Sequence, residues 1–392
     1  MFKLSRSQSK LLLFLIPAFS FPLVDVGFGT VAIYVVGVIT SFSFVVSGGG
    51  LQVRTWELIF FSASLLFLCV SLLIQNSATF HYDAVDNNYI FRIGVFFCYF
   101  YLTRCYIVNN YSSRSKALED FTRVLFTLLV LSLLFEYVLR GFSLQSFLYL
   151  YKARQDLGGI DSVHYNRFSG FTSFPGDLAA IIVLCFVCSH SIKSSKITLA
   201  VLFLMLMLTQ SKAGLILLLG YYLVKSITKF SMSGVLAVSV ITAFSIFLVH
   251  YFELEYFIKF LDNLDHYALR SKRAQEMFFF LESSWVEIFF GNFKLDTMYF
   301  ESELFSTLNR NGVFGSLWFF IVLFSSIVFY FKTRNEQRKN LLLFLLMFLG
   351  FYCFLSAGFS RSKIGLIYIM YISILFFENH SANHRRFCDE DN

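Results

Sequence analysis

The chain has 392 residues, of which 57% are hydrophobic and 15% are charged, with a formal net charge of +7. A soluble chain carries about a quarter charged residues, so the composition predicts an integral membrane protein and not a soluble globular domain. The basic residues neither line one helix face nor interleave with aromatic residues in a polar segment, so the charge does not indicate nucleic-acid binding.

Long apolar runs alternate with short charged segments along the chain. A run of about 20 residues is long enough for one membrane-spanning helix, and shorter runs are expected to be tilted or partly re-entrant. The expected spans are residues 11–24, 26–47, 57–74, 90–108, 121–139, 177–192, 197–210, 213–229, 233–251, 312–331, 341–357 and 364–377. The sequence therefore predicts an all-α fold, a polytopic integral membrane protein of about twelve transmembrane helices in a single membrane domain over residues 1–392.

The first apolar run follows Lys3, Arg6 and Lys10, as it would in a signal peptide. No small-x-small cleavage pattern follows, and a second apolar run begins almost at once. We therefore expect an uncleaved first helix.

Basic residues are distributed unevenly between the two sets of connections. One set holds most of the lysine and arginine, with Lys332–Lys339 as its most basic segment, whereas the short connections of the other set hold only Arg92, Lys212, Arg361 and Lys363. Because basic residues of short loops accumulate on the cytoplasmic side, both termini are predicted to be cytoplasmic.

Two long connections, residues 140–176 and 252–311, are predicted on the opposite, outer side of the membrane as large loops. Their basic residues are Arg140, Lys152, Arg154, Arg167, Lys259, Arg270, Lys272, Arg273, Lys294 and Arg310. Long loops escape the charge rule, so the topology stands. Solvated loops commonly contain charge, and loops that receive a polyanionic ligand also need it; charge alone leaves both interpretations open.

The first large loop ends in a motif that runs from Arg167 to Asp177 and leads directly into an apolar span. Pro175 fits the first turn of a helix, where its missing N–H costs nothing. Asp177 suits the positive end of the helix dipole. A helix start thus explains the proline and the aspartate, but not Arg167 just outside the expected bilayer.

A polar break, Thr209–Gly214, separates the next two apolar spans. The simplest interpretation is a hairpin turn at the outer surface. A lysine ammonium at that surface can equally hold a phosphate, which makes Lys212 a second candidate.

The second large loop contains an amphipathic segment after Arg273. Apolar residues recur at helical spacing through residues 274–290, which predicts an interfacial helix that ends at Gly291. The loop then leaves through Glu301 and Glu303 towards glycines 312 and 315, small residues that permit close helix approach. Solvated carboxylates are the simplest interpretation of the two glutamates.

Together these motifs form an ordered series. Arg-x-x-Gly-Phe with a following proline comes first, then Ser-Lys-Ala-Gly after an apolar span, then Arg273 leading to Gly291, and then Glu301 leading to Gly312. In this order, over residues 120–360, the chain resembles the O-antigen polymerase and ligase superfamily, and most of all the Wzy-type polymerases. The resemblance implies a multi-pass protein of the bacterial inner membrane that joins oligosaccharide repeat units at the periplasmic face.

The resemblance also implies roles for particular residues. Arg167 and Arg273 match the arginines that engage the pyrophosphate of the lipid-linked glycan. Lys212 stands where many relatives carry arginine, and it keeps the charge but lacks the bidentate fork. Glu301 falls where the ligases carry histidine and many polymerases an acidic residue, which favours the polymerase branch. Glu303 is the alternative catalytic base.

The implied reaction uses an undecaprenyl-diphosphate-linked glycan as donor and another as acceptor, within membrane lipid. A hydroxyl of the incoming unit attacks the anomeric carbon of the growing chain and expels undecaprenyl diphosphate. Fixed cations stabilise the charge on the leaving group, and a carboxylate accepts the hydroxyl proton. The scheme needs no metal ion and no cofactor. The family also implies a chain-length regulator and a flippase as partners.

Three other functions remain as alternatives. An O-antigen ligase differs in its acceptor and not in its chemistry. A lipid-linked oligosaccharide flippase is expected to have internal repeats and charges buried in mid-membrane, but no repeat is evident and such charges are scarce apart from Asp25 and Glu136. An outer-leaflet acyltransferase needs a histidine within the membrane, whereas His190 and His250 lie at span ends.

Overall fold

The computed structural model describes residues 85–142, 167–172, 175–229, 280–291, 303–333, 335–355 and 363–376, with Leu11, Leu15, Ser62, Ala63 and Leu66. All regular secondary structure in these residues is helical, so the all-α class is confirmed for this part of the chain. The helices are α4 (Val85–Asn110), α5 (Arg114–Gly141), α7 (Pro175–Ser191), α8 (Lys196–Leu208), α9 (Lys212–Lys229), α14 (Trp285–Phe290), α15 (Glu303–Gly315), α16 (Leu317–Lys332), α17 (Glu336–Leu355) and α18 (Lys363–Leu375).

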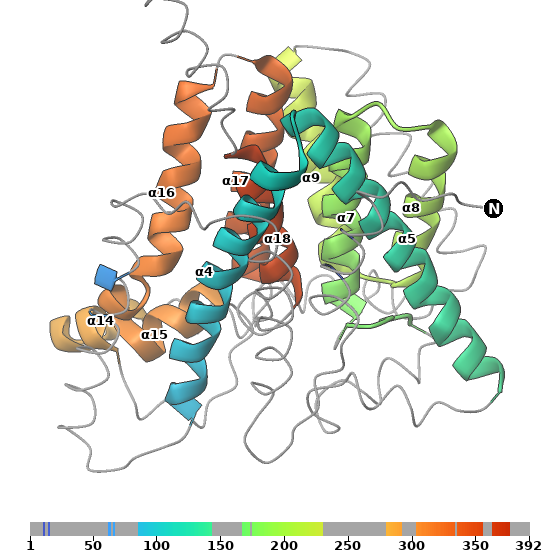
Figure 1. Cartoon of the computed structure of the whole chain (residues 1–392). Helices are drawn as coiled ribbons and strands as arrows, with labels where there is room; N and C mark the ends of the chain where they lie inside the picture. The colour runs from blue at the N-terminus through green and yellow to red at the C-terminus, as the bar shows by residue number, and fades with distance from the viewer. Residues whose placement is uncertain are drawn as a thin grey trace, which may run out of the picture.

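The longer helices pack as an antiparallel bundle (Figure 1). Helices α4, α7, α9 and α16 run in one direction, and α5, α8 and α17 return in the other (Figure 1). Helix α18 begins beside residue Phe171 and ends beside α16, where Phe376 stacks on Phe329 with ring centroids 3.9 Å apart. We call the end that holds residues 167–172 and 209–212 the site end, and the opposite end the far end.

Helix α7 lies at the centre of the bundle. It packs against α5, α8, α9, α17 and α18, and its residues from Leu178 to Ser189 are all buried. Its sequence is apolar on every side, as expected for a helix that is surrounded by others. Close van der Waals packing of these side chains helps to hold the bundle together.

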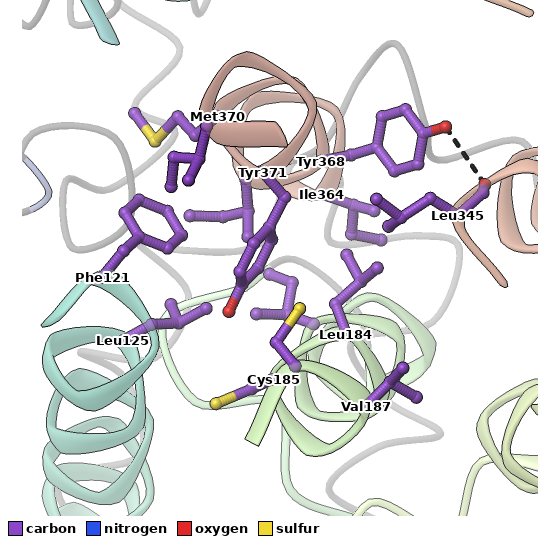
Figure 2. Close-up of a cluster of buried hydrophobic side chains, with 14 of the residues drawn as sticks. Phe121, Leu125, Leu184, Cys185, Val187, Leu345, Ile364, Tyr368, Met370 and Tyr371 are labelled. Carbon is purple, nitrogen blue, oxygen red and sulfur yellow. Dashed lines mark hydrogen bonds between the residues drawn. The ribbon is translucent and has the colours of Figure 1, made fainter. Parts of the chain in front are cut away.

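Tyr371 of α18 lies in the core between α5 and α7 (Figure 2). Its ring meets Phe121 edge-on with the centroids 4.8 Å apart, and its hydroxyl lies 3.4 Å from the Thr122 hydroxyl. Tyr368, on the same helix, donates its hydroxyl proton to the backbone oxygen of Leu345 at 3.1 Å (Figure 2). These contacts fix the rotation of α18 against its neighbours.

By length and composition, Arg114–Gly141 is the one helix among the described residues that can cross a membrane. Shorter apolar helices cover Phe96–Val108, Pro175–Ser191, Lys196–Leu208, Lys212–Leu223 and Lys363–Leu375. The prediction of about twelve spans therefore stays a prediction, and spans 11–24, 26–47, 57–74 and 233–251 fall on residues that are not described or are described only singly.

The other expected spans each overlap a helix, but their boundaries differ. Span 121–139 is part of the longer α5, because Ser113 caps that helix through the Lys116 amide and Arg140 still lies within it. Span 312–331 was placed too early: Gly312 has φ 65° and ψ −177°, which breaks the helix, and α16 begins at Leu317.

The continuous interfacial helix expected over residues 274–290 is wrong in its described part. The chain breaks at residues 283–284, and α14 covers only Trp285–Phe290. Ser284 and Glu287 form a capping box, which starts a new helix. Gly291 ends α14 with φ 88°, so the expected helix end there is confirmed. Trp285 and Val286 are exposed, as an interfacial position would require.

Close contact between α7 and α9 depends on Gly214. A Cβ atom at this position would lie 2.8 Å from the Ala179 Cβ and 2.7 Å from the Leu206 Cδ1. The leucine can move, but the alanine Cβ is fixed to its backbone. We expect Gly214→Ala to lower the stability by about 1–3 kcal/mol, measured as a drop in the thermal midpoint of the purified protein. Gly350→Ala is the matched control, because nothing lies within 4 Å of that position; equal midpoints for the two variants would contradict this packing.

Candidate functional site

Arg167 lies beside the break between α8 and α9. Its Nε donates to the backbone oxygen of Thr209 at 3.3 Å, and the next amide, that of Phe168, donates to Leu208 at 3.2 Å. The end of the first large loop therefore packs against the segment that leads to Lys212. Arg167 and Lys212 are far apart in sequence, but both lie beside this break in the fold.

The break itself is a buried turn. Thr209, Gln210 and Ser211 are 0%, 4% and 3% exposed, so the expected hairpin turn is present but it is not solvated. Gln210 has φ 48°, a left-handed conformation that is uncommon for residues other than glycine. Such backbone conformations cost on the order of 1–3 kcal/mol and cluster at functional sites.

Three helices begin around residues 167–172. Helix α7 starts at Pro175 with Asp177 in its first turn, which confirms both expectations for this motif. Helix α9 starts at Lys212, and the Ser211 hydroxyl would lie 3.9 Å from a Cβ at Gly176. Helix α18 starts at Lys363. Helix N-termini carry partial positive charge and unsatisfied N–H groups, so this arrangement favours an anion.

A lysine and a glutamate hold residues 169–171 in place. The buried Lys363 donates through Nζ to the Phe171 oxygen at 2.5 Å. The buried Glu136 accepts the backbone N–H groups of Ser169 and Gly170 through Oε2, at 2.8 and 2.6 Å. Both contacts join helices that are distant in sequence to the segment that follows Arg167.

Positive groups dominate this part of the molecule. Arg140, Arg167 and Lys212 outnumber the buried carboxylates Glu136 and Asp177. Arg167 and Lys212 are only half-buried and so remain partly accessible, whereas Lys363 is 3% exposed. Chemically, the site fits a ligand with several negatively charged oxygens.

Of the other predicted site residues, Arg273 and Glu301 lie outside the described residues. Glu303 is the first residue of α15, which lies at the site end of the bundle (Figure 1), and its side chain is outside the described part. The predicted pairing of Arg167 and Arg273 with a glutamate base therefore stays a prediction.

Sequence reasoning did not assign Glu136, Arg140 or Lys363 to the site. The sequence does indicate an ion pair between Glu136 and Arg140, because the two residues are four positions apart at the end of one helix. Lys363 gave no such signal, because its neighbours in the fold come from residues almost two hundred positions earlier.

No group of three or more His, Cys, Asp or Glu side chains gathers in the described part of the chain. No protein-family model matches the chain, and no curated protein matches it either.

Proposed function

We propose that the protein is a glycosyltransferase of the bacterial inner membrane that polymerises undecaprenyl-diphosphate-linked oligosaccharide repeat units into O-antigen or a related surface polysaccharide. The observation that carries the proposal is the position of Arg167, which packs against the turn before Lys212 among the first turns of α7, α9 and α18. Such a site fits a polyanion, and a lipid diphosphate is one.

A membrane location is supported by exposed apolar rows on the helices. On α5, Leu131, Leu134 and Val138 are 50%, 54% and 49% exposed and share one face. Phe324, Val328 and Phe331 form a similar row on α16. Contiguous apolar surface of this kind is unfavourable in water and favourable in lipid.

The orientation is supported by the basic residues at the far end. Arg114 and Lys116 start α5 there, Lys193 and Lys196 join α7 to α8, and Lys332 ends α16. Because such residues stay on the cytoplasmic side, the far end faces the cytoplasm and the site end faces the periplasm. With the about twelve spans that the sequence predicts, both termini are then cytoplasmic as well.

In the proposed reaction, an acceptor hydroxyl forms a bond to the anomeric carbon of the donor chain. The bond from that carbon to the diphosphate oxygen breaks, and its electron pair leaves with undecaprenyl diphosphate. Arg167, Lys212 and Arg273 stabilise the charge that develops on the leaving group. Glu301 or Glu303 accepts the hydroxyl proton.

Deletion of the gene in its native host tests the proposal. We expect a silver-stained gel of the surface polysaccharide to show the core with a single repeat unit, and wild-type complementation to restore the ladder. A core without any repeat, together with lipid-linked polymer, would identify a ligase instead. Repeat units trapped on the cytoplasmic face would identify a flippase, and an unchanged ladder would contradict all three functions.

A further inference from the structure

Three polar residues form a stripe along the last turns of α5. Ser132, Glu136 and Arg140 are spaced four residues apart, so they share one face of the helix. All of them bind the segment 167–172. Ser132 accepts the Phe171 N–H through Oγ at 2.7 Å, and Lys363 binds the carbonyl of the same residue.

Glu136 is the centre of this stripe. Its Oε1 accepts from Arg140 Nε at 3.1 Å and from the Arg140 terminal nitrogen at 2.7 Å. Its Oε2 accepts the amides of Ser169 and Gly170. The four donors fill the capacity of an ionised carboxylate, and charge-assisted hydrogen bonds are the strong ones. The side chain is 1% exposed, so water cannot replace a lost partner.

Arg140 continues the chain of contacts to Arg167. It donates to the backbone oxygen of Arg167 at 2.5 Å, and its guanidinium lies 4.7 Å from the centroid of the Phe168 ring. The backbone that follows the Arg167 side chain is therefore anchored: the Arg167 carbonyl by Arg140, and the amides of residues 169 and 170 by Glu136.

The turn that Glu136 binds has little room for another backbone conformation or for a side chain at residue 170. Gly170 has φ +55°, and a Cβ there would lie 2.0 Å from the Ser132 Oγ. The chain at this point lies against α5 at the closest approach that a glycine permits. A shift of the segment would carry Arg167 with it.

We propose that Glu136 is the positioning residue for Arg167, and that it sets the guanidinium to receive an organic diphosphate. The identity of the ligand rests on the proposed function. Glu136 does not touch the ligand, because its carboxylate is buried and fully engaged by Arg140 and the 169–170 amides. Its effect on binding is therefore indirect, through the segment that carries Arg167.

A double-mutant cycle tests this dependence. Wild type, Glu136→Gln, Arg167→Ala and the double variant are purified in detergent, and the Kd for farnesyl diphosphate is measured for each. Hydrogen exchange of the peptide that covers residues 167–172 is measured on the same samples. The amide of glutamine keeps one acceptor oxygen but loses the charge, so two of the four donors lose their acceptor.

We expect Glu136→Gln to raise the Kd about tenfold, the loss typical of one charged hydrogen-bonding group. Arg167→Ala is expected to raise it about tenfold or more. The double variant should match Arg167→Ala within about a factor of two, whereas independent effects would multiply to about a hundredfold. Exchange in residues 167–172 should become about tenfold faster in Glu136→Gln.

Glu119→Gln is the matched control. Glu119 forms an i, i+4 ion pair with Arg123 on the same helix, at 2.5 Å, but at the far end and with side chains 35% and 63% exposed. It should change neither the Kd nor the exchange of residues 167–172.

Multiplying losses in the double variant, or an unchanged Kd in Glu136→Gln, would overturn the positioning role. A wild-type protein that binds no farnesyl diphosphate would overturn this proposal together with the diphosphate site. A wild-type protein that binds it with the coupling above, but does not elongate glycan, would refute the proposed function and leave the positioning role standing.

Discussion

Cells that carry Arg167→Ala in place of the wild-type protein are expected to lose the polysaccharide ladder and to keep the core with one repeat unit. Loss of one donor that is aimed at a developing negative charge typically lowers kcat about 10²–10³-fold. The half-buried Arg167 lies on the turn before Lys212, so its removal takes away the guanidinium at that place. The gel of surface polysaccharide and the turnover of the purified protein measure the effect.

Arg167→Lys provides a graded comparison. Lysine keeps the charge but loses the planar fork and the Nε contact to Thr209, so we expect short chains at reduced rate. Arg123→Gln, an exposed position on α5 at the far end, should restore a normal ladder. A normal ladder from Arg167→Ala, with the protein at wild-type abundance, would refute the role of Arg167 in stabilising the leaving diphosphate.

Gly312→Ala is expected to disrupt the packing of α14 on α15. Gly312 has φ 65°, and a Cβ there would lie 2.3 Å from the Phe289 backbone oxygen and 2.5 Å from the Gly291 nitrogen. These are backbone atoms, which cannot rotate away as a side chain can. Conformational strain and overpacking together should cost about 2 kcal/mol or more, seen as a lower thermal midpoint in detergent.

The same substitution should also reduce polymer formation, because α15 begins at the candidate base Glu303. Gly141→Ala is the control, since nothing lies within 4 Å of that position. Midpoints that agree within error for Gly312→Ala and Gly141→Ala would show that the kink tolerates a side chain, contrary to the contacts at Phe289 and Gly291.

Apolar runs located the helices well but not their ends. Helix α5 begins seven residues before the run that predicted it, because a capping serine and solvated charges extend a helix past its apolar part. At Gly312 and Ser284, by contrast, the helices are shorter than the apolar pattern predicts. Each interrupts a pattern that reads as one helix, through a positive φ in the first case and a capping box in the second. Capping interactions and backbone conformation, which hydropathy does not record, decided these boundaries.

The site was predictable where its residues lie on sequence motifs. Arg167 and Lys212 were singled out from short polar segments beside apolar spans, and the fold brings those segments together. Lys363 was read only as a charge in a short connection. Its contact with Phe171 depends on how α18 packs against α7, and no local pattern encodes that arrangement.

The most direct test of the proposed function is reconstitution of the purified protein in liposomes with an undecaprenyl-diphosphate-linked repeat unit as the sole glycan. Mass spectrometry of the lipid-linked products then reports chain length. We predict a series of oligomers, with one undecaprenyl diphosphate released for each unit added, and no series with Arg167→Ala. Recovery of only the single repeat unit from the wild-type protein, whether left in place or moved across the bilayer, would contradict polymerisation.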